Sequence, residues 1–195
     1  MRDVSMQALR RLQRLLRARL TDLIDWDNFS LEAVVSAVAH RVGGEIHVHA
    51  FHWDRYAYSG LTLGWVKDGQ KQFLILFEEQ ASDEHRLIII LHELMHILLG
   101  HCTAILAPRV LRQVLVEIGF LPADVQPVMH TRVLLPVATS EVLPVRSDDD
   151  ELEAELGATM VVTRARQAGT LPPVGRLFTP EQTSISRLLG CLAEE

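Results

Sequence analysis

Apolar and polar positions recur along the chain in patterns that predict two helices before the first strand. Leucines at helical spacing within residues 3–24 predict an amphipathic N-terminal helix (Leu9, Leu12, Leu15, Leu16 and Leu20). Ser30 is a favourable N-cap for a second helix, LEAVVSAVAHRV, which Gly43 and Gly44 are expected to end. The first 44 residues are therefore expected to be mainly helical.

Three strand-like segments follow this helical region. Residues 45–53 alternate in polarity, 59–66 are rich in β-forming residues, and 71–79 are mostly apolar. The sequence KDGQ at 67–70 predicts the turn of a hairpin between the last two segments. We expect a small antiparallel sheet, in which 59–66 or 72–77 could supply an edge for an extended peptide.

Residues 87–106 form a long apolar segment whose length alone suits a membrane-spanning helix. The segment contains four ionisable residues, each costly in lipid (His92, Glu93, His96 and His101). The chain has no second hydrophobic segment that could shelter them. The pattern therefore favours a buried helix in the core of a globular domain.

The patterns predict further helices after this segment. One is expected at 109–119, followed by a proline-interrupted connection at 120–147. Three aspartates at 148–150 then open the helix ELEAELGATMVV, where acidic side chains stabilise the positive end of the helix dipole. A loop with three prolines and a short helix at 180–192 are expected to complete the chain.

Composition and charge are those of a globular intracellular protein. The 195 residues are 48% hydrophobic and 23% charged, an ordinary balance for one α+β domain. The net charge of −6 argues against a domain-wide positive field that would attract nucleic acid. Cys102 and Cys191 belong to no CxxC pair, and the arginine-rich N-terminus lacks the apolar run of a secretory signal. We expect a cytoplasmic protein that binds neither nucleic acid directly nor a membrane.

The sequence HELMH at 92–96 has the spacing of a metal-binding helix. On an α-helix, His92 and His96 differ in direction by about 40°, so both imidazoles can reach one ion. Catalytic zinc takes three protein ligands and lowers the pKa of a water molecule, whose proton Glu93 could accept as a general base. Two histidines and a glutamate are costly in an apolar helix without a role. The motif therefore predicts a zinc metallopeptidase.

His101 is a candidate third ligand because it follows the motif closely in the sequence, but helical geometry argues against this role. It lies nine residues after His92, which turns it by about 180° if the helix continues. In the known three-histidine motif, the last histidine follows the second by six residues, whereas here the gap is five. We expect His101 to support the site through capping or a backbone hydrogen bond.

Spacing alone leaves the third ligand open among three glutamates of the later helix. Glu151 shares a helical stripe with residues that would allow close packing on the HELMH helix (Ala154, Ala158 and Val162). Glu155 shares much of that stripe and is the second candidate, while Glu153 is the third. Donors to an oxyanion beside the metal are also open, with four candidates (Tyr56, Tyr58, His130 and Arg132).

The sequence LHELMHILLGH, followed by a helix with the pattern ExEAE, resembles the ImmA/IrrE-type metallopeptidases, bacterial zinc peptidases tied to mobile elements and stress responses. The matching positions are His92, Glu93, His96, Gly100, His101, Glu151, Glu153, Ala154 and Ala158. The resemblance covers roughly residues 30–165, including the polar break at 82–86 before the motif. It implies a zincin-like domain at 29–167, after an N-terminal helix at 1–28 and before a C-terminal loop and short helix at 168–195.

The resemblance also implies a site and a substrate. Zn²⁺ would be held by His92, His96 and Glu151, as in gluzincins, with Glu93 as the catalytic base. The substrate would be a specific protein, such as a helix-turn-helix transcriptional repressor. Two departures, Met95 where the family usually has glycine and a long insert at 102–147, motivate an alternative. In that alternative, the chain is a metal-bearing regulatory module that binds a repressor or toxin without cutting it.

Overall fold

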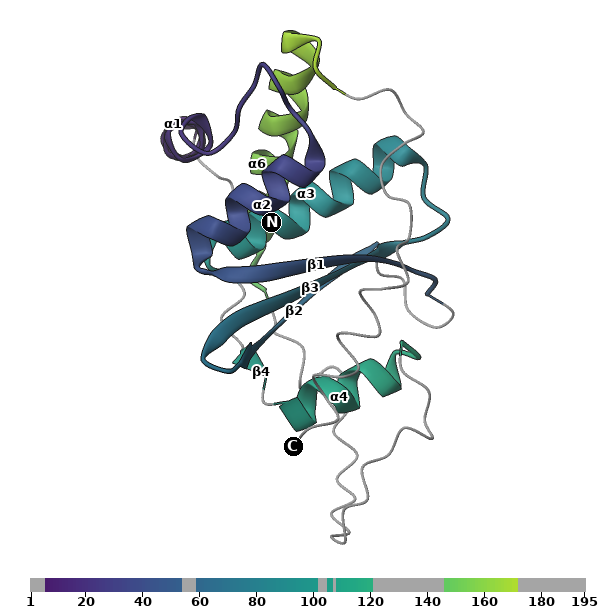
Figure 1. Ribbon diagram of the computed structural model, residues 1–195. Helices are drawn as coiled ribbons and strands as arrows, with labels where there is room; N and C mark the ends of the chain where they lie inside the picture. Colours follow the sequence, from purple (N-terminus) through teal and green to yellow (C-terminus); the bar gives the residue numbers. More distant parts are fainter. Residues whose placement is uncertain (1–5, 54–58, 102–104, 107, 121–145, 172–195) are drawn as a thin grey trace, which may run out of the picture.

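A four-stranded sheet separates two sets of helices in the part of the chain that the structure describes (Figure 1). This computed structural model describes residues 6–53, 59–101, 105–106, 108–120 and 146–171. The elements are α1 (Met6–Thr21), α2 (Leu31–Val42), β1 (Gly44–Phe51), β2 (Gly60–Lys67), β3 (Gln70–Glu78), α3 (Asp83–Leu99), β4 (Ile105–Leu106), α4 (Pro108–Glu117) and α6 (Asp148–Ala168). The predicted α+β class is confirmed.

The sheet is mixed, so the prediction of an antiparallel sheet was wrong. Its strand order is β1-β3-β2-β4; β3 runs parallel to β1 and antiparallel to β2. Because β3 inserts between the first two strands, two strands that point the same way become neighbours. The apolar sequence of β3 fits this central position, since its alternate side chains are buried on both faces of the sheet.

The sheet edges also differ in part from the prediction. Residues 72–77 lie in the central strand β3 and supply no edge. Strand β2 pairs with β4 only through Gly64 and Trp65, so among the described residues its earlier half has no strand on that side. The predicted hairpin at 67–70 is confirmed: Lys67 pairs with Gln70, and Asp68 and Gly69 both have the positive φ of a type I′ turn.

Two apolar cores lie on opposite faces of the sheet. The larger core joins α2, α3 and α6 to one face, and it includes Leu20 at the end of the N-terminal helix. The smaller core lies between the other face and α4, around Leu111 and Leu115. Alternation along β3 divides its side chains between them, with Ile75 in the first core and Leu76 in the second. The sheet therefore holds α3 on one face by burial of apolar surface.

The central helix α3 is buried as predicted, but its bounds differ. Ser82 caps its start and Gly100, in the left-handed conformation, ends it, so it covers Asp83–Leu99 and not 87–106. The polar residues before Leu87 form its first turn, while Ile105 and Leu106 form strand β4. Among the described residues, no helix combines the length and hydropathy that a bilayer span requires. The helices predicted at 109–119 and from 148 are confirmed as α4 and α6, and the helix predicted at 180–192 lies outside the described residues.

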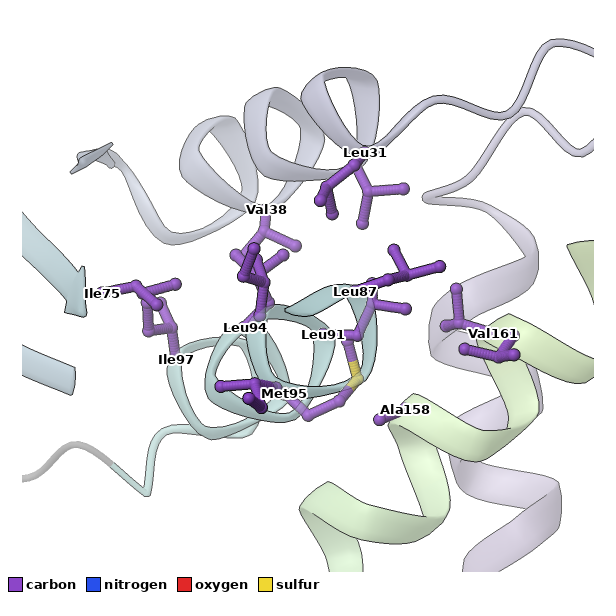
Figure 2. Packing of buried hydrophobic residues seen from close by; sticks show 14 of the residues in the cluster. Leu31, Val38, Ile75, Leu87, Leu91, Leu94, Met95, Ile97, Ala158 and Val161 are labelled. Carbon is purple, nitrogen blue, oxygen red and sulfur yellow. The ribbon is translucent and has the colours of Figure 1, made fainter. Parts of the chain in front are cut away.

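Met95 fills a space that a glycine on α6 leaves open. The Met95 side chain is fully buried where α3 and α6 meet, next to Ala158 (Figure 2). A Cβ atom at Gly157 would lie 2.8 Å from both Cγ and Sδ of Met95. The Met95 side chain is thus matched by the absence of a side chain on the facing helix.

We expect the effect of Gly157→Ala on the free energy of unfolding to change sign with the residue at position 95. In the wild type, overpacking costs about 1–3 kcal/mol and exceeds the gain of about 1 kcal/mol in helix propensity. We expect a net loss of about 1 kcal/mol. In a Met95→Ala background the clash is absent, and the same change is expected to stabilise the protein. Urea unfolding of the four proteins in this double-mutant cycle measures the coupling; equal effects in both backgrounds would contradict the predicted contact.

Candidate metal centre

Two capped helices bring the predicted ligands together. Helix α3 carries His92 and His96 one turn apart. Helix α6 begins at a capping box formed by two hydrogen bonds. The Ser147 hydroxyl accepts one from the backbone amide of Asp150, and the Asp150 carboxylate accepts one from the backbone amide of Ser147. This cap places Glu151 in the first turn of α6. The small buried residues that follow allow close approach of the two helices (Ala154, Gly157 and Ala158).

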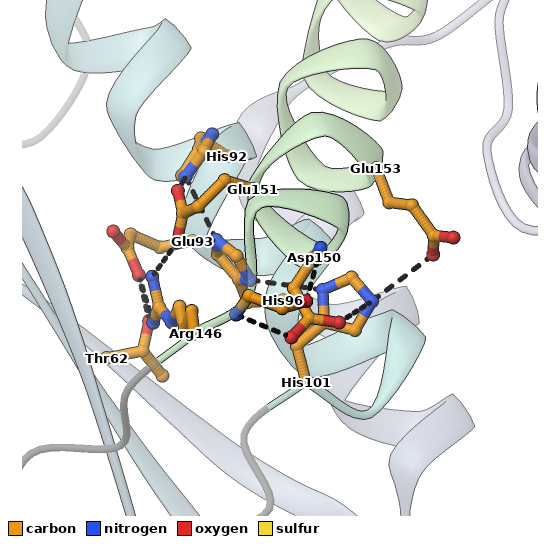
Figure 3. A network of polar contacts seen from close by, with 10 residues as sticks. Thr62, His92, Glu93, His96, His101, Arg146, Asp150, Glu151 and Glu153 are labelled. Atoms are coloured by element: carbon orange, nitrogen blue, oxygen red, sulfur yellow. Dashed lines mark hydrogen bonds and ion pairs between the residues drawn. The ribbon is translucent and has the colours of Figure 1, made fainter. Parts of the chain in front are cut away.

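The side chains of His92, His96 and Glu151 converge on one point (Figure 3). One ligand atom from each lies within 4.8 Å of the others. The two Nε2 atoms are 3.0 Å apart, and Glu151 carboxylate oxygens lie 3.1 Å from His92 Nε2 and 3.5 Å from His96 Nε2. Among the described residues, this is the only group of three such side chains arranged to hold a metal ion.

The structure separates the three candidate glutamates. Glu151 faces the two histidines, whereas the Glu153 carboxylate lies 3.3 Å from His101 Nε2. Glu155 is exposed to solvent and belongs to no candidate metal group in the described part of the chain. Although the three glutamates lie close together in the sequence, Glu151 is a candidate metal ligand, Glu153 is a partner of His101, and Glu155 is a surface residue.

Glu93 lies beside the cluster, buried under strand β2. Its Oε2 atom accepts hydrogen bonds from the Thr62 hydroxyl at 2.6 Å and the Arg146 guanidinium at 3.0 Å. A Cβ atom at Gly60 would come within 2.9 Å of the other carboxylate oxygen, so only glycine lets β2 pass this close to Glu93. Thr62 and Arg146 thus hold one oxygen and orient the carboxylate.

Sequence reasoning did not identify Thr62 and Arg146 as parts of the site. Thr62 shares a face of β2 with Gly60, but strand alternation does not say which helix covers that face. Arg146 precedes the cap of α6, and its guanidinium also lies 3.7 Å from Glu151. It thus bridges two acidic groups from different helices. The four oxyanion candidates named from the sequence lie outside the described residues.

Burial keeps the His96 imidazole neutral. Loss of solvent, and after it the nearby positive charge of Arg146, lowers the pKa of His96 to about 3. A neutral imidazole has a lone pair free for a metal ion, whereas a protonated one does not. The site is therefore ready to bind a metal near neutral pH without first losing a proton from this ligand.

We expect the metal-free protein to lose stability as the pH falls from about 6.5 towards 3. In this range the unfolded chain binds a proton at His96 and the folded chain does not, which costs about 1.4 kcal/mol per pH unit. His96→Gln is expected to remove this part of the slope between about pH 6.5 and 4.5, above the range in which most carboxylates titrate. Urea unfolding across this range measures the slope. Equal slopes for the wild type and His96→Gln over this range would contradict the prediction.

The backbone hydrogen bond expected of His101 is present, but its ring does not lie on the opposite side from His96, as helical geometry had suggested. The helix ends before it, and Gly100 turns the chain so that the His101 ring returns to the side of His96. The backbone amide of His101 donates a hydrogen bond to the His96 carbonyl oxygen at 2.9 Å and so caps the end of α3. The Nδ1 atoms of the two rings are 3.1 Å apart, so one must donate and the other accept.

The contacts of His101 determine which nitrogen of each ring carries the proton. If His96 binds a metal through Nε2, its proton is on Nδ1 and is donated to His101 Nδ1. The His101 proton is then on Nε2, which faces carboxylate oxygens of Glu153 at 3.3 Å and Asp150 at 3.6 Å. This chain of contacts orients His96 and increases its basicity as a ligand.

We expect His101→Ala to weaken zinc binding by about 10–100-fold, because His96 loses the acceptor that orients it. The cap is kept, since it uses the backbone amide of residue 101. Competition with a chromogenic chelator measures the dissociation constant. His85→Ala, at an exposed position of α3, serves as the control and is expected to bind zinc as the wild type does. Equal zinc affinity in His101→Ala and wild type would rule out this orienting role.

The chain was compared with protein-family models, with curated proteins and with solved structures, and none of them matched.

Proposed function

We propose that the chain is a zinc-dependent metalloendopeptidase. The observation that carries this proposal is the convergence of His92, His96 and Glu151 beside the buried carboxylate of Glu93. A purely structural metal site has no need of a general base next to it, whereas a hydrolytic site does. The proposed activity therefore accounts for Glu93 as well as for the three candidate ligands.

The donor set fits zinc. Zinc binds imidazole nitrogen and carboxylate oxygen at about 2.0–2.2 Å, so two donors on a tetrahedral ion lie roughly 3.3–3.6 Å apart. The two Nε2 atoms are 3.0 Å apart, which is close to this range, and Glu151 presents Oε2 at 3.1 Å from His92 and Oε1 at 3.5 Å from His96. Two imidazoles and one carboxylate also leave a fourth position, as in catalytic zinc sites. When bound, zinc would polarise a peptide carbonyl and lower the pKa of water at the site.

In this proposal the protein residues move the proton. Thr62 and Arg146 hold Oε2 of Glu93, which leaves Oε1 to accept a proton from the attacking water. The protonated carboxyl group then donates that proton to the leaving amine, and the peptide bond is broken by addition of one water molecule. The Arg146 guanidinium lies 3.0 Å from Glu93 and 3.7 Å from Glu151, so it holds the two carboxylates near each other at the entrance of α6.

Strand β2 offers a place for an extended substrate. Its residues before Gly64 have no strand partner on one side among the described residues. The same segment contains Gly60 and Thr62, which lie against Glu93. A peptide added to this edge would form backbone hydrogen bonds and pass the candidate metal centre. By the family resemblance, we propose a helix-turn-helix transcriptional repressor as the substrate class.

Co-expression and purification with the product of a neighbouring repressor gene tests this proposal. The proposal expects about one zinc ion per chain and two defined fragments of the repressor. Cleavage should stop when zinc is removed with a chelator and return when zinc is added back. A zinc-loaded protein that leaves each neighbouring repressor intact would argue against the peptidase.

A second candidate function is a metal-bearing regulatory module that binds a repressor or toxin without cutting it. The observation that favours it is the ion pair between Arg146 and Glu93, which occupies one oxygen of the proposed base. In this case the purified partner would remain bound and intact. Recovery of specific fragments in the experiment above would eliminate this alternative.

A further inference from the structure

A cavity separate from the candidate metal centre lies at the C-terminal end of α3. Its volume is about 470 Å³, and its walls come from four elements: α1, α2, β3 and the last turn of α3. None of the candidate ligands or Glu93 lines it. It is therefore a separate site on the helix that carries the HELMH motif.

The charged groups around this cavity are all positive. Arg19 comes from the last turn of α1, Arg41 from the last turn of α2, and Lys71 from the start of β3. The ion pairs of the described residues include none of these three, and no acidic residue lines the cavity. Three cations from separate elements are unexpected at one place in a chain of net charge −6. They form a local positive field that attracts anions.

The inner wall of the cavity is apolar. Phe73 and Ile97 are buried there, and Leu99 is half-buried beside them. The end of α3 contributes a partial negative charge equivalent to about half an elementary charge, which three full positive charges outweigh. The volume falls in the range of about 300–1,000 Å³ that small-molecule sites occupy. The cavity thus offers charge at its rim and an apolar surface within.

We propose that this cavity binds a small molecule in which phosphate groups are joined to a body with an apolar surface, such as the face of the base in a nucleoside diphosphate or the acyl chains of a short phosphatidic acid. The guanidinium groups of Arg19 and Arg41 would each form paired hydrogen bonds to phosphate oxygens. Lys71 would contribute a third positive charge. Phe73 and Ile97 would contact the apolar body, which distinguishes this ligand from a free phosphate. This binding site is independent of the proposed peptidase activity.

Isothermal titration calorimetry on the full-length, chelator-treated chain tests the proposal, since removal of metal prevents phosphate binding at the other site. The probes are ADP, dihexanoyl phosphatidic acid, inorganic pyrophosphate and adenosine. We expect either ADP or the phosphatidic acid to bind more tightly than pyrophosphate and more tightly than adenosine. Whichever of ADP and phosphatidic acid binds more tightly shows whether the apolar part of the ligand is a nucleoside base or an acyl chain. Arg19→Glu and Arg41→Glu are each expected to weaken that binding by about tenfold or more.

Arg17→Glu is the matched control. Arg17 is exposed on the same helix as Arg19 and does not line the cavity, so its reversal makes the same change in net charge. It is expected to weaken binding by less than about twofold because its charge is screened by salt. Equal effects at positions 17 and 19 would overturn the proposal. It would also be overturned by pyrophosphate binding as tightly as ADP and phosphatidic acid, or by no binding of either at millimolar concentration.

Discussion

Glu93→Gln is expected to slow cleavage of the protein substrate by about 10²–10⁴-fold while the chain keeps its zinc. Glutamine has nearly the same shape as glutamate, and its carbonyl oxygen can still accept hydrogen bonds from Thr62 and Arg146. It cannot take a proton from the attacking water. Quantification of repressor fragments over time measures the rate, and metal analysis of the same sample measures the zinc content.

The control for this experiment is Glu155→Gln, which removes a carboxylate from an exposed position of α6. This variant is expected to cleave at the wild-type rate. If Glu93→Gln cleaved the substrate as fast as the wild type, the role of Glu93 as the base would be refuted. If Glu93→Gln lost zinc as well as activity, the carboxylate would be needed for the metal site and could not be assigned to proton transfer alone.

Glu151→Ala is expected to lower zinc affinity by more than about 100-fold, because it removes one of three candidate ligands and not a supporting group. A ligand that binds only the folded state stabilises it by about 2.7 kcal/mol at a concentration of one hundred times its dissociation constant. Zinc at this level should therefore raise the melting temperature of the wild type clearly. The same zinc concentration should leave Glu151→Ala almost unchanged.

The matched control is Glu155→Ala, on the same helix and one turn further on. Spacing along the sequence did not separate these two glutamates, but the structure places only Glu151 against both histidines. Glu155→Ala should therefore show the full zinc-dependent rise in melting temperature. A larger loss of zinc affinity in Glu155→Ala than in Glu151→Ala would show that α6 presents a different face to the metal.

Local patterns were enough to predict most elements of this protein. The Ser30 cap, the Asp68-Gly69 turn and the buried helix around His92 depend on interactions between residues a few positions apart. The pairing of His92 with His96 belongs to the same class, because helix geometry alone brings residues four apart to one face. These features could be read from the sequence since no distant contact is needed to create them.

The order of strands depends on contacts that no local pattern contains. Alternation shows that β1 and β3 are strands, but it does not show that β3 inserts between β1 and β2. In the apolar run at 87–106, Gly100 is a local stop signal for the helix, but nothing local shows that Ile105 and Leu106 join the sheet. Strand pairing is decided by packing and by the path of the connections, which act over long sequence separations.

The candidate site combines both kinds of information. That two imidazoles share a helix face with a glutamate beside them follows from residues 92–96 alone, because the helical period is a local property. The positions of Glu151 beside them and of Glu153 beside His101 follow from the packing of the fold. The same is true of the hydrogen bonds from Thr62 and Arg146 to Glu93. The physical reason is that these contacts depend on how α6 and β2 pack against α3, where burial of apolar side chains such as Met95 sets the distance between the elements.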